Sequence, residues 1–276
     1  MAELLRISDP NDPRVAVFRD IRERDLVRDG GFIAEGTVVV DGLVRSRFFR
    51  PERLLVLENR VAGLADLLAA LPPDVPVLVA GRNVIDAVAG FPMHRGVLAH
   101  GVARVARPGA EDLATRLAGL AETGGIVVVA VGIANHDNIG AIFRNAAAFG
   151  AGLAILDETS CDPLYRKALR VSAGAVLHLP FLRAEPLAAL AALTQAGFSA
   201  FALSPSGDPD LAALDRAGPA ALFLGTEGEG LPLELMAAMR RLRIDMVPGF
   251  DSLNVATSAA IALQRLYSAR RTGTSA

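Results

Sequence analysis

Continuous apolar runs alternate with segments of helical periodicity over the second half of the chain. The runs lie at 126–131, 153–156, 176–180, 198–203, 220–224 and 242–246. They do not alternate with polar residues, which is typical of parallel strands buried on both faces. The spacing between them predicts helices at 139–149, 165–173, 186–196, 233–239 and 253–269. This alternation predicts an α/β fold whose mostly parallel sheet carries helices on both faces.

The first third of the chain repeats this pattern on a smaller scale. A polar segment to residue 19 and a charged segment at 20–29, suited to a short surface helix, come before an apolar start at 32–33 and a helix-like segment through 44. The same reasoning predicts strands at 54–57, 75–79, 96–99 and 101–105, and helices at 61–71 and 83–88. Arg107-Pro108-Gly109 interrupts the periodicity. We therefore predict a smaller α/β domain at 1–107, a linker or helix at 108–123, and a larger domain at 124–276.

Composition places the chain among globular proteins. Apolar residues make up 52% of the 276 residues and charged residues 21%, which is enough to build a large core. No apolar run is long enough to span a membrane, the start lacks the pattern of a signal peptide, and Cys161 is the single cysteine, so we expect a cytoplasmic protein without disulfides. The four histidines are scattered without the spacing of metal ligands, and we expect no metal.

Charge does not identify a partner. The net charge is −2 and the isoelectric point is about 6.1, so a strongly basic, nucleic-acid-binding field is absent. Lys167 is the only lysine beside many arginines. Arginine is well suited to phosphate contacts. Biased residue usage explains the same imbalance, and composition leaves both explanations open.

Three polar and glycine-rich segments follow apolar strands in the larger domain: 138–144, 225–230 and 252–255. The carboxyl ends of parallel strands meet at one edge of a sheet, where such folds build their sites. We therefore expect these segments to form a site together. Asn138 and Arg144 are six residues apart, about 240° of helical rotation, so they need not share a helix face.

The chemistry of these segments excludes two common kinds of nucleotide site. The loop before Asn138 lacks the glycine fingerprint of a dinucleotide fold, and the loop at 225–230 lacks the lysine of a phosphate-binding loop. That second loop contains the carboxylates of Glu227 and Glu229, which suit a neutral or cationic ligand. In the third segment Ser252 is a candidate N-cap of the last helix. Capping by Ser252 leaves Asn254, a poor helix former, unexplained.

Taken in order, these segments resemble the motifs of the SpoU/TrmH family of SPOUT RNA methyltransferases. The first reads N-I-G-A-I-F-R-N-A at 138–146, followed by Phe149-Gly150; the second reads L-G-T-E-G-E-G-L at 224–231. The third reads I-D-M at 244–246 and D-S-L-N-V-A at 251–256, and the segment 161–174 is similar as well. The sequence departs from the family at Asn145, where threonine is common, at Asp245, where proline is common, and at 135–136.

The resemblance implies an enzyme that transfers a methyl group from S-adenosylmethionine to a ribose 2′-hydroxyl of structured RNA. It implies a C-terminal trefoil knot and a homodimer formed through the catalytic domain. Arg144 occupies the catalytic position, and the residues placed beside it are Asn138, Glu227, Ser252 and Asn254. The cofactor-binding positions implied are Leu224, Gly225, Gly230, Ile244 and Leu253.

The first domain is similar to the L30e-like substrate-binding domain that often precedes this catalytic domain, on the basis of Gly36, 38–44 and 93–97. It is the expected RNA-recognition element, with Arg45, Arg47, Arg82 and Arg95 as candidate contacts. Such a front domain favours ribosomal over transfer RNA.

Two other readings remain open from the sequence. One is an RNA-binding protein of the same fold that has lost activity, which the presence of both Asn138 and Arg144 disfavours. The other is a nucleotide-dependent oxidoreductase, which the missing glycine fingerprint disfavours.

Overall fold

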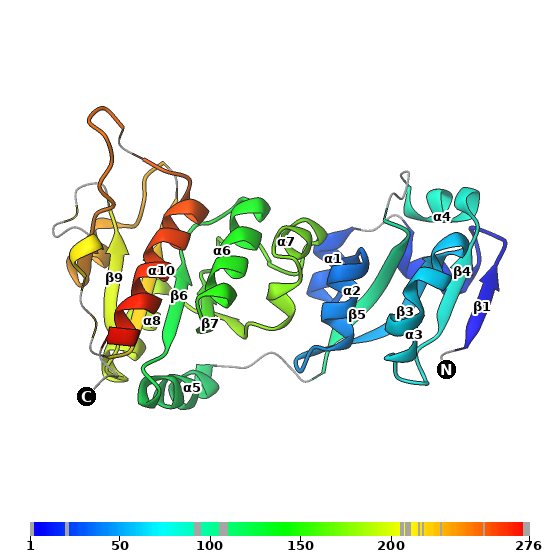
Figure 1. Cartoon of the computed structure of the whole chain (residues 1–276), viewed down its shortest axis with the longest axis horizontal. Coiled ribbons are helices and arrows are strands. Elements are labelled where there is room, and N and C mark those ends of the chain that lie inside the picture. The colour runs from blue at the N-terminus through cyan, green and yellow to red at the C-terminus, as the bar shows by residue number, and fades with distance from the viewer. Residues whose placement is uncertain are drawn as a thin grey trace. The chain divides into compact units, whose positions relative to one another are not determined.

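The chain forms two compact units. The computed structural model describes residues 3–19, 22–90, 95–104, 110–204, 207, 211–214, 216, 218–226, 228–250 and 252–272. The first unit comprises Met1–Ala106 together with Asp162–His178, and the second comprises Arg107–Cys161 together with Leu179–Ala276 (Figure 1). The division into functional domains at 107 and 124 stays a prediction, while residues 162–178 pack within the first unit.

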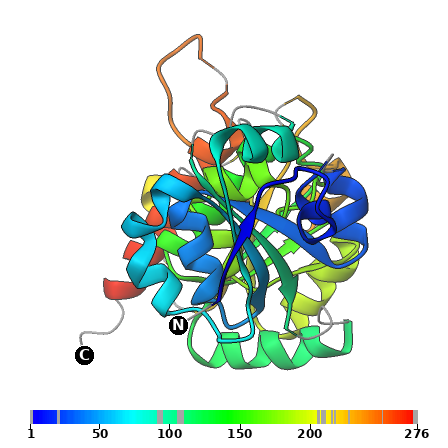
Figure 2. The same cartoon turned by 90° about the vertical axis from the view of Figure 1, so that its right-hand side faces the viewer.

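The first unit is built on a five-stranded mixed sheet. Its strands are β1 (Leu4–Ile7), β2 (Gly31–Glu35), β3 (Phe49–Leu57), β4 (Val77–Ala80) and β5 (Val97–Ala103). Their order is β1-β4-β3-β5-β2, and Figure 2 shows the edge strand β1 as the dark blue arrow. Strands β1, β4 and β3 are parallel, whereas β5 is antiparallel to both β3 and β2.

Short helices cover this sheet. They are α1 (Glu23–Arg28), α2 (Thr37–Val44), α3 (Ala65–Ala69), α4 (Arg82–Ala89) and α7 (Arg166–Val171), with 3-10 turns η1 (Pro13–Phe18), η2 (Glu58–Arg60), η3 (Ala62–Leu64) and η4 (Ala175–Leu177). Phe18 of η1 and Ile85 of α4 pack with Leu55, Leu78 and Leu98 in one apolar cluster.

The segment Asp162–His178 is fastened to the first unit by polar contacts as well as by packing. The Ser46 hydroxyl donates to the carbonyl of Leu177 at 2.5 Å, and Arg166 pairs with Glu23. Helix α7 packs against β2, and the 3-10 turn η4 packs against α2. A stretch of chain that follows the first strands of the second unit therefore completes the first unit.

The second unit contains a six-stranded parallel sheet. Its strands are β6 (Ile126–Ala130), β7 (Ala151–Leu156), β8 (Phe181–Arg183), β9 (Ser199–Leu203), β10 (Ala220–Leu224) and β11 (Arg240–Leu242), in the order β11-β9-β10-β6-β7-β8. Every pair is parallel. The central strands β6 and β10 are buried along their whole length.

Helices lie on both faces of this sheet, as the sequence predicted. They are α5 (Ala110–Glu122), α6 (His136–Ala148), α8 (Pro186–Gln195), α9 (Leu233–Ala237) and α10 (Val255–Thr272), with the turn η5 (Leu211–Ala213). Helices α5, α8 and α9 share a core with Val127, Val129, Ala221 and Phe223. On the other face, α6 and α10 lie side by side, α6 packing on β7 and α10 on β10 (Figure 1).

Two of the expected strands were wrong in position or type. The run 176–180 contains the end of the 3-10 turn Ala175–Leu177, and the strand follows at Phe181–Arg183. Val176 and Leu177 are buried in the first unit, and a short buried apolar run cannot distinguish strand from helix. The strand expected at 242–246 is Arg240–Leu242, because Ile244 and Met246 line a cavity instead.

The polar start of the chain also differs from expectation, since it contains β1 and η1. Of the four residues of β1 only Ile7 is buried, so this edge strand lacks a clear apolar pattern. The strands expected at 96–99 and 101–105 form the single strand β5.

A buried arginine ties the end of α10 to the start of β6. Arg216 is 5% exposed, and its guanidinium donates to the carbonyls of Leu266 at 3.0 Å, Gly218 at 2.6 Å and Gly125 at 3.2 Å, and also to that of Gly124. A planar guanidinium can reach several carbonyls at once, which a lysine cannot. Arg216 therefore holds α10 and the loop before β6 in one arrangement.

Replacing Arg216 with alanine should destabilise the second unit, because several buried carbonyls lose charged donors. We expect the free energy of unfolding to fall by about 2–4 kcal/mol, measured by urea denaturation followed by circular dichroism. Arg45→Ala is the control, since Arg45 is exposed and, among the described residues, its side chain bonds to Asp41 one turn earlier. Equal midpoints for the two variants would contradict the role of Arg216.

Candidate functional site

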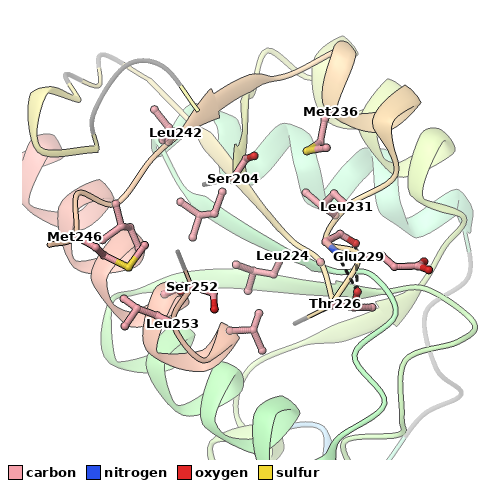
Figure 3. Close-up of a pocket in the computed structure, with 17 residues that line it drawn as sticks. Ser204, Leu224, Thr226, Glu229, Leu231, Met236, Leu242, Met246, Ser252 and Leu253 are labelled. Atoms are coloured by element: carbon pink, nitrogen blue, oxygen red, sulfur yellow. Dashed lines mark hydrogen bonds between the residues drawn. The ribbon is translucent and has the colours of Figure 1, made fainter. Parts of the chain in front are cut away.

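A cavity opens at the carboxyl ends of β9, β10 and β11. Its volume is about 400 Å³, within the range of small-molecule sites. The loops that follow these three strands and the start of α10 form its walls (Figure 3). The lining residues are Leu203, Ser204, Leu224, Gly225, Thr226, Gly228, Glu229, Gly230, Leu231, Met236, Leu242, Ile244, Met246, Ser252, Leu253, Val255 and Ser258.

The walls are mostly apolar side chains and glycine backbone. The polar side chains are the hydroxyls of three serines and Thr226 and the carboxylate of Glu229, and the described lining residues include no basic side chain. Figure 3 shows Met246 and Leu253 on one side of the cavity, Glu229 on the loop opposite, and Leu224 between them. This lining suits a ligand with an apolar body that is neutral or positively charged.

The loop after β10 is folded tightly on itself. A Cβ atom on Gly225 would lie 2.4 Å from the carbonyl carbon of Gly230 and 2.4 Å from the nitrogen of Leu231, so only glycine fits there. The Thr226 hydroxyl accepts a hydrogen bond from the Gly230 amide at 3.1 Å. The two ends of the loop are thus in contact, and its backbone faces the cavity.

The segment between β11 and α10 lines the cavity with both of its ends. Ile244 and Met246 line it from one end, and Ser252 and Leu253 from the other. Between them the amide of Phe250 donates to the carbonyl of Val247 at 3.1 Å, and both side chains are more than two-thirds exposed.

Asn254 caps α10, in place of the predicted Ser252. Its Oδ1 accepts from the amides of Ala256 at 2.9 Å and Thr257 at 3.3 Å, the pattern of an N-cap. Its Nδ2 donates to Oδ1 of Asn138 at 2.9 Å. One side chain therefore begins α10 and bonds to the first turn of α6, which explains an asparagine at this position.

Helix α6 presents two different faces. Asn135 caps it by accepting from the amide of Asp137 at 2.8 Å, and Asn138 is 6% exposed. Asn145 donates from Nδ2 to the carbonyl of Ala256 at 2.8 Å. Arg144 is exposed, as its rotation from Asn138 suggested, and it does not line the cavity. The helix thus bonds to α10 on one side and offers Arg144 to solvent.

Asp157 organises the loops that follow β6 and β7. Its carboxylate accepts from the amides of Gly132 at 3.0 Å and Ser160 at 2.9 Å, and from the hydroxyls of Ser160 at 2.5 Å and of Thr159. Burial alone would raise the pKa of Asp157, but these donors outweigh burial and lower the pKa below its ordinary value of 3.8. The ionised carboxylate therefore fixes the loop that leads to Asn138.

The structure brings most of the predicted site residues together. Six of them line this cavity: Leu224, Gly225, Gly230, Ile244, Ser252 and Leu253. Asn138 and Asn254 are bonded to each other beside it, and Arg144 stands apart on the outer side of α6. Glu227 lies outside the described residues, as do Met93, His94 and Asp251 of the quoted motifs.

Several lining residues were not among the predicted site residues. Of these, Thr226 and Met246 stand within the quoted motifs, whereas Ser204 lies outside all of them. The available signal was position, because Ser204 directly follows β9 in the same way that Gly225 follows β10. Strand β9 lies between β11 and β10, so its end reaches the same edge.

The predicted RNA-contacting arginines fall into two groups in the first unit. Arg82 begins α4 and Arg95 precedes β5, at the sheet end where β2, β3 and β4 finish. Arg45 and Arg47 follow α2, at the opposite end of the sheet, where β3 begins. Arg45 is bonded to Asp41, which raises the pKa of Arg45.

Arg60 lies at the same end of the sheet as Arg82 and Arg95. A Cβ on Gly36 would lie 2.8 Å from Cδ of Arg95, and one on Gly96 would lie 2.6 Å from Cγ of Arg60. Helices α2 and α4 both begin at this end without a side-chain cap. Basic side chains and helix N-termini together favour anionic ligands.

Comparisons with known proteins agree on one family. Residues 125–264 match the model of the SpoU rRNA Methylase family. A tRNA/rRNA methyltransferase of Mycobacterium tuberculosis, itself uncharacterised, is 39% identical over 97% of this chain and 92% of its own length. The 23S rRNA (adenosine(1067)-2′-O)-methyltransferase of Streptomyces azureus is 30% identical over 95% of this chain and 96% of its own.

Solved structures share the fold over nearly the whole chain. The AdoMet-bound rRNA methyltransferase of Sinorhizobium meliloti matches with a TM-score of 0.77 and 25% identity, covering 98% of both chains. The SpoU methyltransferase AviRb of Streptomyces viridochromogenes, in complex with AdoMet, matches with a TM-score of 0.77 and 22% identity over 95% of this chain and 100% of its own.

The described residues provide neither a membrane-spanning helix nor a cluster of metal ligands. None of their helices combines the length and apolarity needed to cross a membrane. They contain no group of three or more histidine, cysteine, aspartate or glutamate side chains arranged to hold a metal ion.

Replacing Asp157 with asparagine should destabilise the protein in a pH-dependent way. The pKa of Asp157 is lower in the folded state, so the contribution of its carboxylate is complete above pH 3.8 and is lost as the pH falls through the folded-state pKa. We expect a loss of about 1–3 kcal/mol at neutral pH. Urea denaturation at neutral pH and near pH 3 measures it. A stability difference that is the same at both pH values would contradict the assignment.

Proposed function

Because the chain belongs to the SpoU rRNA methylase family, we propose that it transfers a methyl group from S-adenosylmethionine to a ribose 2′-hydroxyl of RNA. The observation that carries this proposal is the convergence of the loops after β9, β10 and β11 and the start of α10 on one cavity beside α6. The relative from Streptomyces azureus, a 2′-O-methyltransferase, is similar over nearly the entire chain and supports the ribose 2′-oxygen as the acceptor atom.

The residues of the cavity fit S-adenosylmethionine. Leu224, Ile244 and Leu253 offer apolar surface to an adenosine group, and the loop around Gly225 offers backbone amides and carbonyls. The carboxylate of Glu229 provides a negative charge for a ligand that carries a sulfonium cation. When bound, the cofactor supplies a methyl group activated by its positively charged sulfur. The absence of basic side chains among the described lining residues disfavours a polyphosphate ligand.

Arg144 is the proposed catalytic residue for the acceptor. A guanidinium carries five N–H donors and no acceptor, so it is a poor general base. It is well suited to hold a phosphate and ribose of the target nucleotide by paired hydrogen bonds. Placing the 2′-hydroxyl in line with the methyl group supplies much of the acceleration available to such a reaction. The bond between Asn254 and Asn138 fixes the helix that carries Arg144.

The first unit is the proposed RNA-recognition element. Its basic sheet end, formed by Arg60, Arg82 and Arg95, is the better candidate for phosphate contacts, because two uncapped helix N-termini accompany it. Arg45 and Arg47 lie at the other end and serve a second contact at most. Ribosomal RNA is the proposed substrate class, with transfer RNA second, and the site of action is the cytoplasm. Structured RNA with an extruded nucleotide fits a reaction at a single ribose.

We further expect a homodimer through the second unit, as the family resemblance suggests. The exposed positions Thr257, Ile261, Gln264 and Tyr267 recur at helical spacing on α10 and carry no charge. Tyr267 packs against Phe149 at the end of α6 with ring centroids 6.4 Å apart. An uncharged, partly aromatic helix face is typical of an interface. The trefoil knot stays a prediction from the resemblance.

Gly225→Ala should weaken cofactor binding strongly, because its Cβ would collide with the backbone of Gly230 and Leu231. We expect the Kd for S-adenosylmethionine, measured by calorimetry, to rise by about 100-fold or more. Gly119→Ala is the control, since a Cβ at Gly119 would meet nothing within 4 Å and this residue lies on α5, outside the cavity lining. A Kd that is unchanged in Gly225→Ala would place the cofactor elsewhere.

Arg144→Ala should remove methyl transfer while leaving cofactor binding intact, because Arg144 does not line the cavity. Incubation with radiolabelled S-adenosylmethionine and unmodified total RNA, followed by nucleoside analysis, should show 2′-O-methylation by the unmodified protein. We expect kcat to fall at least about 100-fold in the variant, with the Kd for the cofactor within about twofold.

The control for this experiment is Arg116→Ala, on α5, which covers the opposite face of the sheet. Full activity of Arg144→Ala would refute the role of Arg144. Methylation of a base in place of ribose, or of no RNA at all, would refute the proposed function.

A further inference from the structure

Asn145 forms a second amide bridge between α6 and α10. It lies seven residues after Asn138, about two helical turns, so both side chains project from the same side of α6. Asn138 accepts from Asn254 at 2.9 Å, and Asn145 donates to the carbonyl of Ala256 at 2.8 Å. The first bond is donated by Asn254 at the start of α10, and the second is donated by Asn145 on α6. Together they fix both the separation and the rotation of α6 against the start of α10.

The bridge from Asn145 joins the two halves of the proposed reaction. On α6 its neighbour in sequence is Arg144, which faces solvent. On α10 its acceptor, Ala256, directly follows Val255, which lines the cavity together with Ser252 and Leu253. The carbonyl of Ala256 lies within the first turn of α10 and has a second lone pair for this bond. A shift of α6 along α10 would therefore change the distance between Arg144 and the methyl donor.

The choice of residue supports a role for the side-chain amide. Asparagine is a poor helix former, and position 145 lies inside the thirteen-residue helix α6, away from its first turn. Alanine fills the neighbouring positions 146–148, so the helix readily accepts a smaller side chain there. Asn145 lowers the stability of the helix, and its bond to the carbonyl of Ala256 explains why asparagine stands at this position.

We propose that Asn145 is a positioning residue for methyl transfer, which acts by holding Arg144 of α6 in register with the donor-binding start of α10. This inference rests on the proposed function. Asn145 touches neither the cavity nor, by the geometry of α6, the acceptor that Arg144 would hold. Its effect passes through the bond to Ala256 and should appear in the rate of transfer, with little change in binding of the cofactor.

Three substitutions separate the amide donor from the shape and the helix propensity of the residue. Asn145→Gln keeps an NH2 donor, Asn145→Ala removes it and improves helix propensity, and Asn145→Asp keeps the shape but sets a carboxylate against the Ala256 carbonyl. We expect kcat to decrease in the order unmodified protein, Gln, Ala, Asp, with about 10- to 100-fold lost in the alanine variant. KM for the cofactor should stay within about threefold, and Tm should fall by no more than about 2–4 °C.

The control is Gln195→Ala, because this exposed amide lies at the end of α8, on the face of the sheet opposite α6 and α10. A structural role alone would instead lower Tm and leave kcat unchanged, or would make alanine as active as glutamine; either result overturns the inference. If the unmodified protein methylates RNA and Asn145→Ala does so at full rate, the proposed function stands and this inference fails. If the unmodified protein methylates no RNA, both fail.

Discussion

The contact between the first turn of α6 and the start of α10 is the constraint on which the site depends. Asn254 supplies it with one amide, whose oxygen caps α10 and whose nitrogen bonds to Asn138. A cap alone could be serine or aspartate, and a bridge alone could leave α10 free to fray. Because one side chain does both, the helix cannot begin elsewhere without losing the bridge. The position of Leu253, one residue earlier, is thereby fixed at the cavity wall.

The cavity itself is defined largely by backbone. Gly225 allows the loop after β10 to fold on Gly230, and the segment after β11 leaves the sheet so that Ile244 and Met246 reach the same space. Such a site depends on loop shape more than on individual side chains. Shape in turn depends on residues outside the cavity: Asp157, whose four donors hold the loops after β6 and β7, and Arg216, which fastens α10. These buried polar groups are satisfied, which makes them rigid supports.

The sequence predicted the architecture well where physics is local and periodic. Continuous apolar runs identified β6, β7, β9 and β10, and glycine and asparagine at strand ends marked the site, because strand ends meet at one edge of a parallel sheet. It failed where the burial partner decides the structure. Val176 and Leu177 are as apolar as a strand, yet they are buried as a 3-10 turn in the first unit. Likewise Ser252 and Asn254 are both good caps, and only the position of Asn138 selects Asn254.

The pairing of strands far apart in sequence also explains why the predicted RNA-contacting arginines lie at two opposite ends of the first sheet. Arg45 and Arg95 are equal candidates in sequence, but Arg45 follows the end of α2 and Arg95 lies at the sheet end where α2 begins. Arg60 follows β3 and Arg95 precedes β5, and the two arginines lie at the same end because these strands are neighbours. The segment Asp162–His178 likewise packs in a unit that its position in the sequence does not reveal. It lies between β7 and β8 in sequence, and it completes the first unit through Ser46 and Glu23. The boundary of folding therefore differs from the boundary in sequence. Substitutions in α7 should therefore change the stability of the first unit, which carries the basic sheet end. The strands β7 and β8, which flank α7 in sequence, belong to the second unit, which carries the cavity.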